Sequence, residues 1–232
     1  MRVAGASPDV PDDPRDMTDD TFDAGEAIEA LTHAYGLKDE LRTGWQLRGI
    51  ESPESVAAHS WGLSLLVVRF CPPDLDRERA LEIAAVHDVA EAEIGDIATR
   101  AETGAQTVEK AEKERRERAA MDGPLSGLGA DIKEVWEAYE ARESPEARFV
   151  KDMDLLDTCL QALVYEREGR YDPGADNEQF EEYDALDEFF ATSEPRIATE
   201  RGRDLFERVR ERYEAAKADA DTDAGPNADG RP

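Results

Sequence analysis

Apolar residues recur every three or four positions along most of the chain, which is the spacing of one face of an α-helix. Runs that alternate Val, Ile or Thr with polar residues, as in half-buried strands, are absent from the sequence. The pattern therefore predicts an all-α fold, with helices over residues 22–35, 54–70, 76–93, 106–121, 129–141, 145–168, 176–191 and 195–216.

Local signals mark some of the helix ends. Asp76 is placed to cap the third helix, and Pro72 and Pro73 end the second. Residues 1–20 and 217–232 are rich in Pro, Asp and Gly and have too little apolar surface to offset the entropy of ordering, which predicts two disordered tails. Residues 21–216 contain no repeat or linker and are predicted to form one domain.

The charge of the chain narrows its possible partners. The formal net charge is −28, and only 6 of the 28 basic residues are Lys. Such a surface disfavours nucleic acid and anionic membranes as partners, because both are bound mainly through clustered positive charge. It suits concentrated salt, where repulsion between surface acids is screened. We therefore expect a halophilic source, such as a haloarchaeon.

Cysteine usage and hydropathy indicate a compartment. Cys71 and Cys159 are isolated in the sequence, which predicts neither a disulfide framework nor a cysteine metal knuckle. No apolar run is long enough to span a membrane, and the first residues lack the apolar core of a signal peptide. A cytoplasmic protein is expected.

The chain has only three histidines. His59 and His87 both lie near apolar faces of predicted helices, whereas His33 has no acidic companion at a useful spacing. Each of the first two could be an ordinary core histidine. However, Asp88 follows His87 directly, and a carboxylate on a helix with a buried flank is costly without a counter-ion.

A divalent metal ion would balance that carboxylate. Imidazole and carboxylate ligands suit Mn, Co, Ni, Fe or Zn, and neighbouring helices can direct such ligands into a bundle core. A fourth ligand is expected in "EARFVKDMDLLDTCLQALVY", which carries Asp152, Asp154 and Asp157 in an apolar helix. Asp154 lies beside the apolar stripe, and the other two acids are less well placed.

These residues resemble the HD-domain metallophosphohydrolases, whose signature is a His, a His-Asp pair and a distant Asp on separate helices. His59, His87, Asp88 and Asp154 match it in order. The strings "LRTGWQLRGIESPESVAAHS", "AAVHDVAEAEIGDI" and "EARFVKDMDLLD" are similar to the 5'-deoxynucleotidase branch, the HD domain-containing 2 proteins, over about residues 26–215.

The resemblance implies a compact multi-helix HD-domain bundle, roles for named residues, and a homodimer. The four matched ligands would hold one divalent ion. Glu91 and Asp96 match acids that act on water and on the leaving group. Residues matched to substrate binding are Arg42, Trp45, Arg48 and Lys151. The implied reaction is hydrolysis of the 5'-phosphate of a small-molecule nucleotide, a (deoxy)nucleoside monophosphate.

One departure and three alternatives stay open at this stage. Some relatives carry an arginine directly before the tryptophan, where this chain has Gly44, which makes Arg42 the candidate for the phosphate-binding arginine. The first alternative, a ppGpp-type hydrolase, would use the same metal arrangement, although Glu91 and Ala92 replace its usual E-D pair. The second alternative, a cyclic-nucleotide phosphodiesterase, would need more histidines to bind a second metal. The third is a non-catalytic binding protein in which the metal only holds the helical bundle together.

The charged stretch "VEKAEKERRERAAM", residues 108–121, has two interpretations. It is typical of a solvated helix with ion pairs between residues four apart. It could also border the pocket and attract an anionic nucleotide.

Overall fold

The chain folds into a helical bundle. This is seen in a computed structural model that describes residues 23–100, 108–172 and 183–223. Within these ranges the β structure is limited to one isolated bridge between Leu41 and Ser55, so the all-α prediction is confirmed. The α-helices are α1 (Ala24–Ala34), α2 (Thr43–Arg48), α3 (Val56–Phe70), α4 (Arg77–Val86), α5 (Glu91–Ile94), α6 (Lys110–Asp122), α7 (Ala130–Ala141), α8 (Pro145–Glu168), α9 (Asp187–Ser193) and α10 (Glu200–Asp223).

Polar caps start several of these helices. The Asp76 carboxylate accepts hydrogen bonds from the backbone N–H groups of Glu78 and Arg79, which confirms its predicted capping role. The Ser144 hydroxyl caps α8 in the same way, and Pro145 occupies the first turn, where a missing N–H does no harm. Gly169 ends α8 in the left-handed conformation that glycine adopts without strain.

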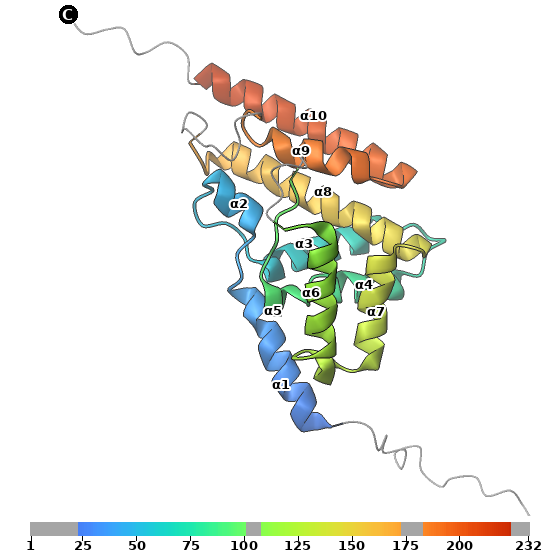
Figure 1. Ribbon diagram of the computed structural model, residues 1–232. Coiled ribbons are helices and arrows are strands. Elements are labelled where there is room, and N and C mark those ends of the chain that lie inside the picture. Colours follow the sequence, from blue (N-terminus) through green and yellow to red (C-terminus); the bar gives the residue numbers. More distant parts are fainter. Residues whose placement is uncertain (1–22, 101–107, 173–182, 224–232) are drawn as a thin grey trace, which may run out of the picture.

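Helix α8 is the central element of the bundle. It contacts α3, α4 and α7 on one side and α9 and α10 on the other (Figure 1). Its buried face includes Phe149, Val150, Met153 and Leu156, which belong to the main hydrophobic core. Acidic side chains at intervening positions of α8 are therefore carried into the interior, where they can meet groups from other helices.

The structure differs from the predicted elements in several places. The predicted helix 76–93 is interrupted, because α4 ends at Val86 and the next residues bond to carbonyls three positions back, as Glu91 N does to Asp88 O at 3.0 Å. Helix α2 was not predicted, since six residues are too few to show a periodic pattern. The helix predicted over 195–216 is found at Glu200–Asp223, so residues 217–223 continue it.

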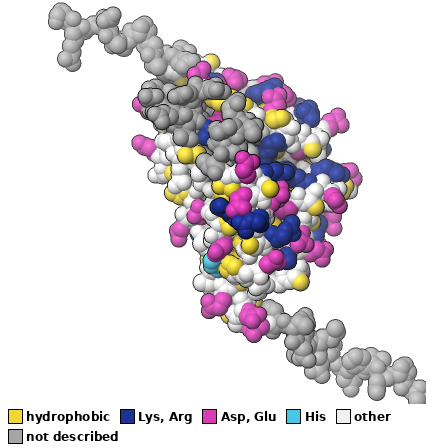
Figure 2. Space-filling model, in the orientation of Figure 1, with side chains coloured by type: hydrophobic (Ala, Val, Ile, Leu, Met, Phe, Trp, Pro, Cys, Tyr) yellow, Lys and Arg dark blue, Asp and Glu magenta, His cyan; other side chains and the backbone are white. Residues whose placement is uncertain are grey.

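Parts of the other predictions fall outside the described residues. These parts are the N-terminal tail, residues 224–232 of the C-terminal tail, and residues 176–182 of the helix predicted over 176–191, which is observed as α9. Among the described helices, we find none with the length and apolar character needed to cross a membrane. Figure 2 shows acidic side chains scattered over one face, with Lys and Arg side chains gathered toward its middle.

Candidate functional site

Four polar side chains from separate elements meet in the interior. His59 lies on α3, and Asp154 lies on α8, while His87 and Asp88 follow the end of α4. His59 Nε2 is 3.1 Å from Asp154 Oδ1 and 3.3 Å from His87 Nε2. His87 Nε2 is in turn 3.0 Å from Asp88 Oδ2. The structure therefore brings together the four residues that the sequence suggested as metal ligands, His59, His87, Asp88 and Asp154, which are called the ligand cluster below.

Both imidazoles are oriented through Nδ1. His59 Nδ1 is 2.7 Å from Asp157 Oδ2, and His87 Nδ1 is 3.0 Å from the carbonyl oxygen of Ala84. Both partners are acceptors, so each Nδ1 donates and each neutral ring has its lone pair on Nε2. When both rings are neutral, their two Nε2 lone pairs face each other at 3.3 Å and cannot form a hydrogen bond, whereas a cation between them satisfies both.

The donor set fits a divalent metal ion. The ligand atoms of His59, His87 and Asp154 lie within 4.8 Å of one another, and all three residues are buried. Two imidazoles with carboxylates are ligands of divalent transition metals. Asp157, which the sequence placed less well than Asp154, contacts the opposite nitrogen of His59 and orients the ring.

The electrostatics of the cluster favour a bound cation. Burial and Arg42 oppose protonation of His59, but hydrogen bonds to Asp154 and Asp157 raise the pKa of the imidazole to about 10. Burial alone would raise the pKa of Asp154, yet Lys151 and His59 hold it well below its usual range. The carboxylates around His59 thus favour positive charge at its Nε2, which a bound metal ion would supply in place of the proton.

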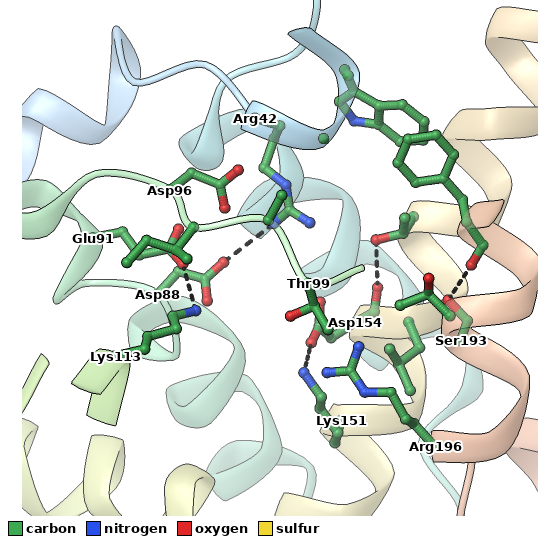
Figure 3. Close-up of a pocket in the computed structure, with 18 residues that line it drawn as sticks. Arg42, Asp88, Glu91, Asp96, Thr99, Lys113, Lys151, Asp154, Ser193 and Arg196 are labelled. Atoms are coloured by element: carbon green, nitrogen blue, oxygen red, sulfur yellow. Dashed lines mark hydrogen bonds and ion pairs between the residues drawn. The ribbon is translucent and has the colours of Figure 1, made fainter. Parts of the chain in front are cut away.

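Glu91 is a buried carboxylate with one oxygen unused. It begins α5, lines the pocket shown in Figure 3, and is only 3% exposed. Oε1 accepts a hydrogen bond from Lys113 Nζ at 3.2 Å, while Oε2 has no hydrogen-bond partner among the described residues. Burial and the nearby Asp88 raise the pKa of Glu91 well above its ordinary value. Glu91 therefore has the raised proton affinity expected of a general base.

Asp96 and Arg42 form the side of the pocket nearest α2. Asp96 Oδ2 accepts a hydrogen bond from Thr43 N at 2.5 Å and thereby caps α2, for which the preceding Arg42 supplies no side-chain cap. Arg42 Nη1 lies 3.5 Å from Asp88 Oδ2. Although burial lowers the pKa of Arg42, Asp96 and Asp88 raise it, so this guanidinium stays charged beside the ligand cluster.

Lys151 and Tyr139 hold Asp154 from its other oxygen. Lys151 Nζ donates to Asp154 Oδ2 at 2.6 Å, and the Tyr139 hydroxyl donates to the same oxygen at 2.7 Å. Because Oδ2 is occupied in this way, Oδ1 is the oxygen that faces His59. Lys151, one of the residues matched to substrate binding, also lines the pocket.

Two aromatic rings, those of Trp45 and Phe189, form an aromatic wall of the pocket. Trp45 stacks on Phe189 with ring centroids 3.9 Å apart, and its Nε1 donates to Glu54 at 3.0 Å. A Cβ atom at Gly44 would lie 3.1 Å from the Phe189 ring, so the small residue allows this close approach. The wall offers a flat apolar surface to a ligand bound in the pocket.

The structure does not bring Arg48 to the pocket. The side chain of Arg48 is buried, and its Nε donates to the carbonyl oxygen of Ala185 at 2.8 Å. Its guanidinium lies over the ring of Tyr171, 4.7 Å from the centroid. Arg48 lies one helical turn after Trp45 on α2 and links this helix to the chain before α9, which a sequence match alone could not reveal.

Sequence reasoning missed three further features of the site. Lys113 on α6 pairs with Glu91 and also with Glu117, at 3.3 Å, so the charged stretch both forms surface pairs and borders the pocket. Arg100 forms a buried two-bond ion pair with Glu188, which fastens the segment after α5 to α9. Arg196, just before α10, lines the pocket as well. Only the charged stretch gave a signal in the sequence.

Comparisons with known proteins agree with this geometry. Residues 34–192 match the HD domain family. The chain is 41% identical over 163 residues to 5'-deoxynucleotidase HDDC2 of Danio rerio, an alignment that covers 68% of this chain and 73% of the relative. It is also 41% identical over 139 residues to 5'-deoxynucleotidase hdd1 of Schizosaccharomyces pombe, covering 56% of this chain and 68% of that protein.

A solved structure shares the architecture. The crystal structure of a Pyrococcus horikoshii protein superposes with a TM-score of 0.62 and 29% sequence identity, over 81% of this chain and 98% of that one. The helical bundle, the convergent His and Asp residues and these matches lead to one conclusion. The chain belongs to the HD domain family.

Proposed function

We propose that this protein is a metal-dependent phosphohydrolase that removes the 5'-phosphate from (deoxy)nucleoside monophosphates. The observation that carries the proposal is the pocket in which His59, His87, Asp88 and Asp154 converge beside the buried Glu91. The similarity to 5'-deoxynucleotidases of animals and yeast supports the same reaction.

The four convergent residues are proposed to hold one divalent ion, chosen from Mn, Co, Ni, Fe or Zn. Support comes from the two Nε2 atoms that face each other at 3.3 Å and from the negative charge around them. When bound, such an ion lowers the pKa of water toward about 7 and polarises a phosphoryl oxygen.

Two acids are proposed to move protons. Glu91 takes a proton from the attacking water through Oε2, the oxygen without a partner in the described structure. As the water oxygen bonds to phosphorus, the bond between phosphorus and the 5'-oxygen breaks. Asp96, whose Oδ2 is held by Thr43 N, donates a proton to the departing 5'-oxygen from its other oxygen. The products are a nucleoside and inorganic phosphate.

The remaining pocket residues are proposed to bind the substrate. Arg42 and Lys151 supply positive charge for the phosphate, and Trp45 with Phe189 supplies a flat surface for the nucleoside. Arg48 is assigned a packing role because its guanidinium is held between Ala185 and Tyr171.

Phosphate release from a panel of dNMPs and NMPs tests the proposal. The protein is stripped with EDTA and assayed in high salt with Mn, Co, Ni, Zn or Mg. We expect release that depends on metal and is abolished in Asp88→Ala. Glu93→Ala is the matched control, because Glu93 is an exposed acid of the same segment that does not line the pocket. Absence of release with every metal, in a folded protein that binds one, would contradict the proposal.

A homodimer is the second part of the proposal. Trp61, Leu65 and Val68 form an apolar stripe on α3 and are 70%, 52% and 52% exposed. Residues three and four positions apart share one helix face, so the stripe is continuous, and a second copy of the chain would cover it. Light scattering should give a dimeric mass for the wild type and a monomeric mass for Trp61→Glu. An unchanged dimeric mass in the variant would exclude this face.

The setting of the enzyme is also proposed. Cys71 and Cys159 are both free, which supports a reducing cytoplasm. The acidic surface supports a halophilic source. A midpoint of unfolding that rises steadily up to molar KCl would agree with the halophilic source, whereas a maximum near 0.1 M KCl would contradict it.

A further inference from the structure

Arg196 is the basic side chain of the pocket that lacks a carboxylate partner. In the described part of the chain, its guanidinium forms no ion pair within 4.0 Å and no hydrogen bond. The other basic side chains of the pocket are each engaged, in the pairs Arg42–Asp88 (3.5 Å), Lys113–Glu91 (3.2 Å) and Lys151–Asp154 (2.6 Å). Arg196 therefore has all its guanidinium donors available to a ligand.

The backbone around Arg196 is fixed to the helix that carries part of the ligand cluster. The Asp152 carboxylate of α8 accepts hydrogen bonds from Ala198 N at 2.8 Å and from Thr199 N at 2.7 Å. Gly202 packs so closely that a Cβ atom there would lie 2.3 Å from Asp152 Oδ2. Asp152 is two residues from Asp154, so this contact sets Arg196 at a constant position relative to the cluster.

The surroundings of Arg196 favour an incoming anion. Burial lowers the pKa of this guanidinium, Asp154 opposes that effect, and Arg142 and Arg42 add to it. A guanidinium nevertheless remains protonated in proteins. A partly buried cation with basic neighbours and no paired carboxylate is unfavourable until an anion arrives. Phosphate oxygens match the planar fork of arginine with two parallel hydrogen bonds.

We propose that Arg196 binds the phosphate group of the substrate, an inference that rests on the proposed phosphohydrolase function. In Figure 3, Arg42 and Arg196 reach the pocket from two sides, with Thr99 and Asp154 between them. A phosphate beside Asp154 thus meets Arg196 from the α10 side and Arg42 from the α2 side. Arg196 thus supplies hydrogen-bond donors in addition to those of Arg42, which is already paired with Asp88.

The test compares Arg196→Ala and Arg196→Lys with the wild type. One readout is binding of inorganic phosphate to the Mn²⁺-loaded protein by calorimetry, and the other is kcat/KM for a deoxynucleoside monophosphate. A hydrogen bond to a charged group is worth enough for a loss of roughly 10- to 100-fold in both readouts in Arg196→Ala. Arg196→Lys should recover part of the loss, because it restores charge without the two-bond geometry.

Controls separate this role from a structural one. Arg201→Ala removes an equal charge from the exposed surface of α10 and should leave both readouts unchanged. Mn²⁺ affinity and the midpoint of unfolding should be the same in all variants. Wild-type phosphate affinity in Arg196→Ala, or wild-type protein that binds no phosphate, would overturn the proposal for Arg196. Metal-loaded wild type that binds phosphate but hydrolyses no nucleotide would instead overturn the proposed function.

Discussion

Asp157→Asn should weaken metal binding without removing any ligand. Asp157 Oδ2 accepts the Nδ1 proton of His59 at 2.7 Å, and the His59 side chain is 0% exposed. An asparagine can turn its NH₂ group toward Nδ1, which favours the tautomer with its proton on Nε2, the nitrogen that faces the cluster. Loss of such a supporting partner typically lowers metal affinity about 10- to 100-fold, or about 1.4–2.7 kcal/mol. Because this bond is short and dry, we expect the upper half of that range.

Calorimetric titration of EDTA-stripped protein with Mn²⁺ measures this effect directly. Asp152→Asn is the matched control, because Asp152 is also buried on α8 but binds the backbone before α10. The control variant should lose stability in urea while its Mn²⁺ affinity stays at the wild-type value. If Asp157→Asn binds Mn²⁺ as tightly as wild type, the bond does not orient His59. Equal losses of affinity in both variants would instead show that α8 is distorted.

Four further predictions concern the carboxylates and the packing around them. Glu91→Gln should lower kcat at least about 100-fold with Mn²⁺ affinity retained; a wild-type kcat would exclude Glu91 as the base. Because burial raises the pKa of Glu91, the folded metal-free protein holds this proton more tightly than the unfolded chain, whose pKa is about 4.3. The free energy of unfolding of the metal-free protein should therefore fall as pH rises from about 4.3 through the pKa of Glu91 in the folded state. In urea unfolding at a series of pH values, Glu91→Gln should flatten this fall; identical pH profiles for the two proteins would refute the prediction. Adding Mn²⁺ at 100 times its Kd to stripped protein should stabilise it by about 2.7 kcal/mol, seen as a rise in Tm that Asp88→Ala reduces; an unchanged Tm in the wild type would argue against a site in the folded core. Gly202→Ala should destabilise the protein by about 1–3 kcal/mol in urea, because the added Cβ meets Asp152 at the α8–α10 contact; a neutral result would show that the two helices can separate easily.

The sequence predicted the helices better than their interruptions. Long segments such as α8 carry enough periodic apolar positions to be recognised, and local caps such as Asp76 lie beside the residues they bind. Helix α2 has six residues and receives its cap from Asp96, 53 positions away from Thr43. The break after Val86 depends on short-range backbone bonds that no residue type at this point announces.

The candidate site, like the fold, was predictable from the sequence only in part. The His-Asp pair is recognisable because histidine is scarce and two polar residues in an apolar run are unusual. Asp157, Lys113 and Arg196 owe their positions to tertiary packing, and their letters resemble those of many surface acids and bases in this highly charged chain. Arg48 matched a motif, yet its buried contacts lie elsewhere. The sequence showed which residues have the chemistry to form a site, and tertiary packing decided which of those residues face the pocket.

The place of His87 at the end of α4 explains why a histidine suits this proposed ligand position. Its Nδ1 donates to the carbonyl oxygen of Ala84, one of the last carbonyls of α4 that have no partner within the helix. The same ring thus satisfies the negative end of the helix macrodipole and turns Nε2 toward the cluster. An aspartate or glutamate at this position could offer an oxygen to a metal, but it has no N–H for Ala84 and would set a negative charge against the negative end of α4, at a cost of about 0.3–1 kcal/mol. Helix termination and the proposed metal ligation therefore favour the same side chain at position 87.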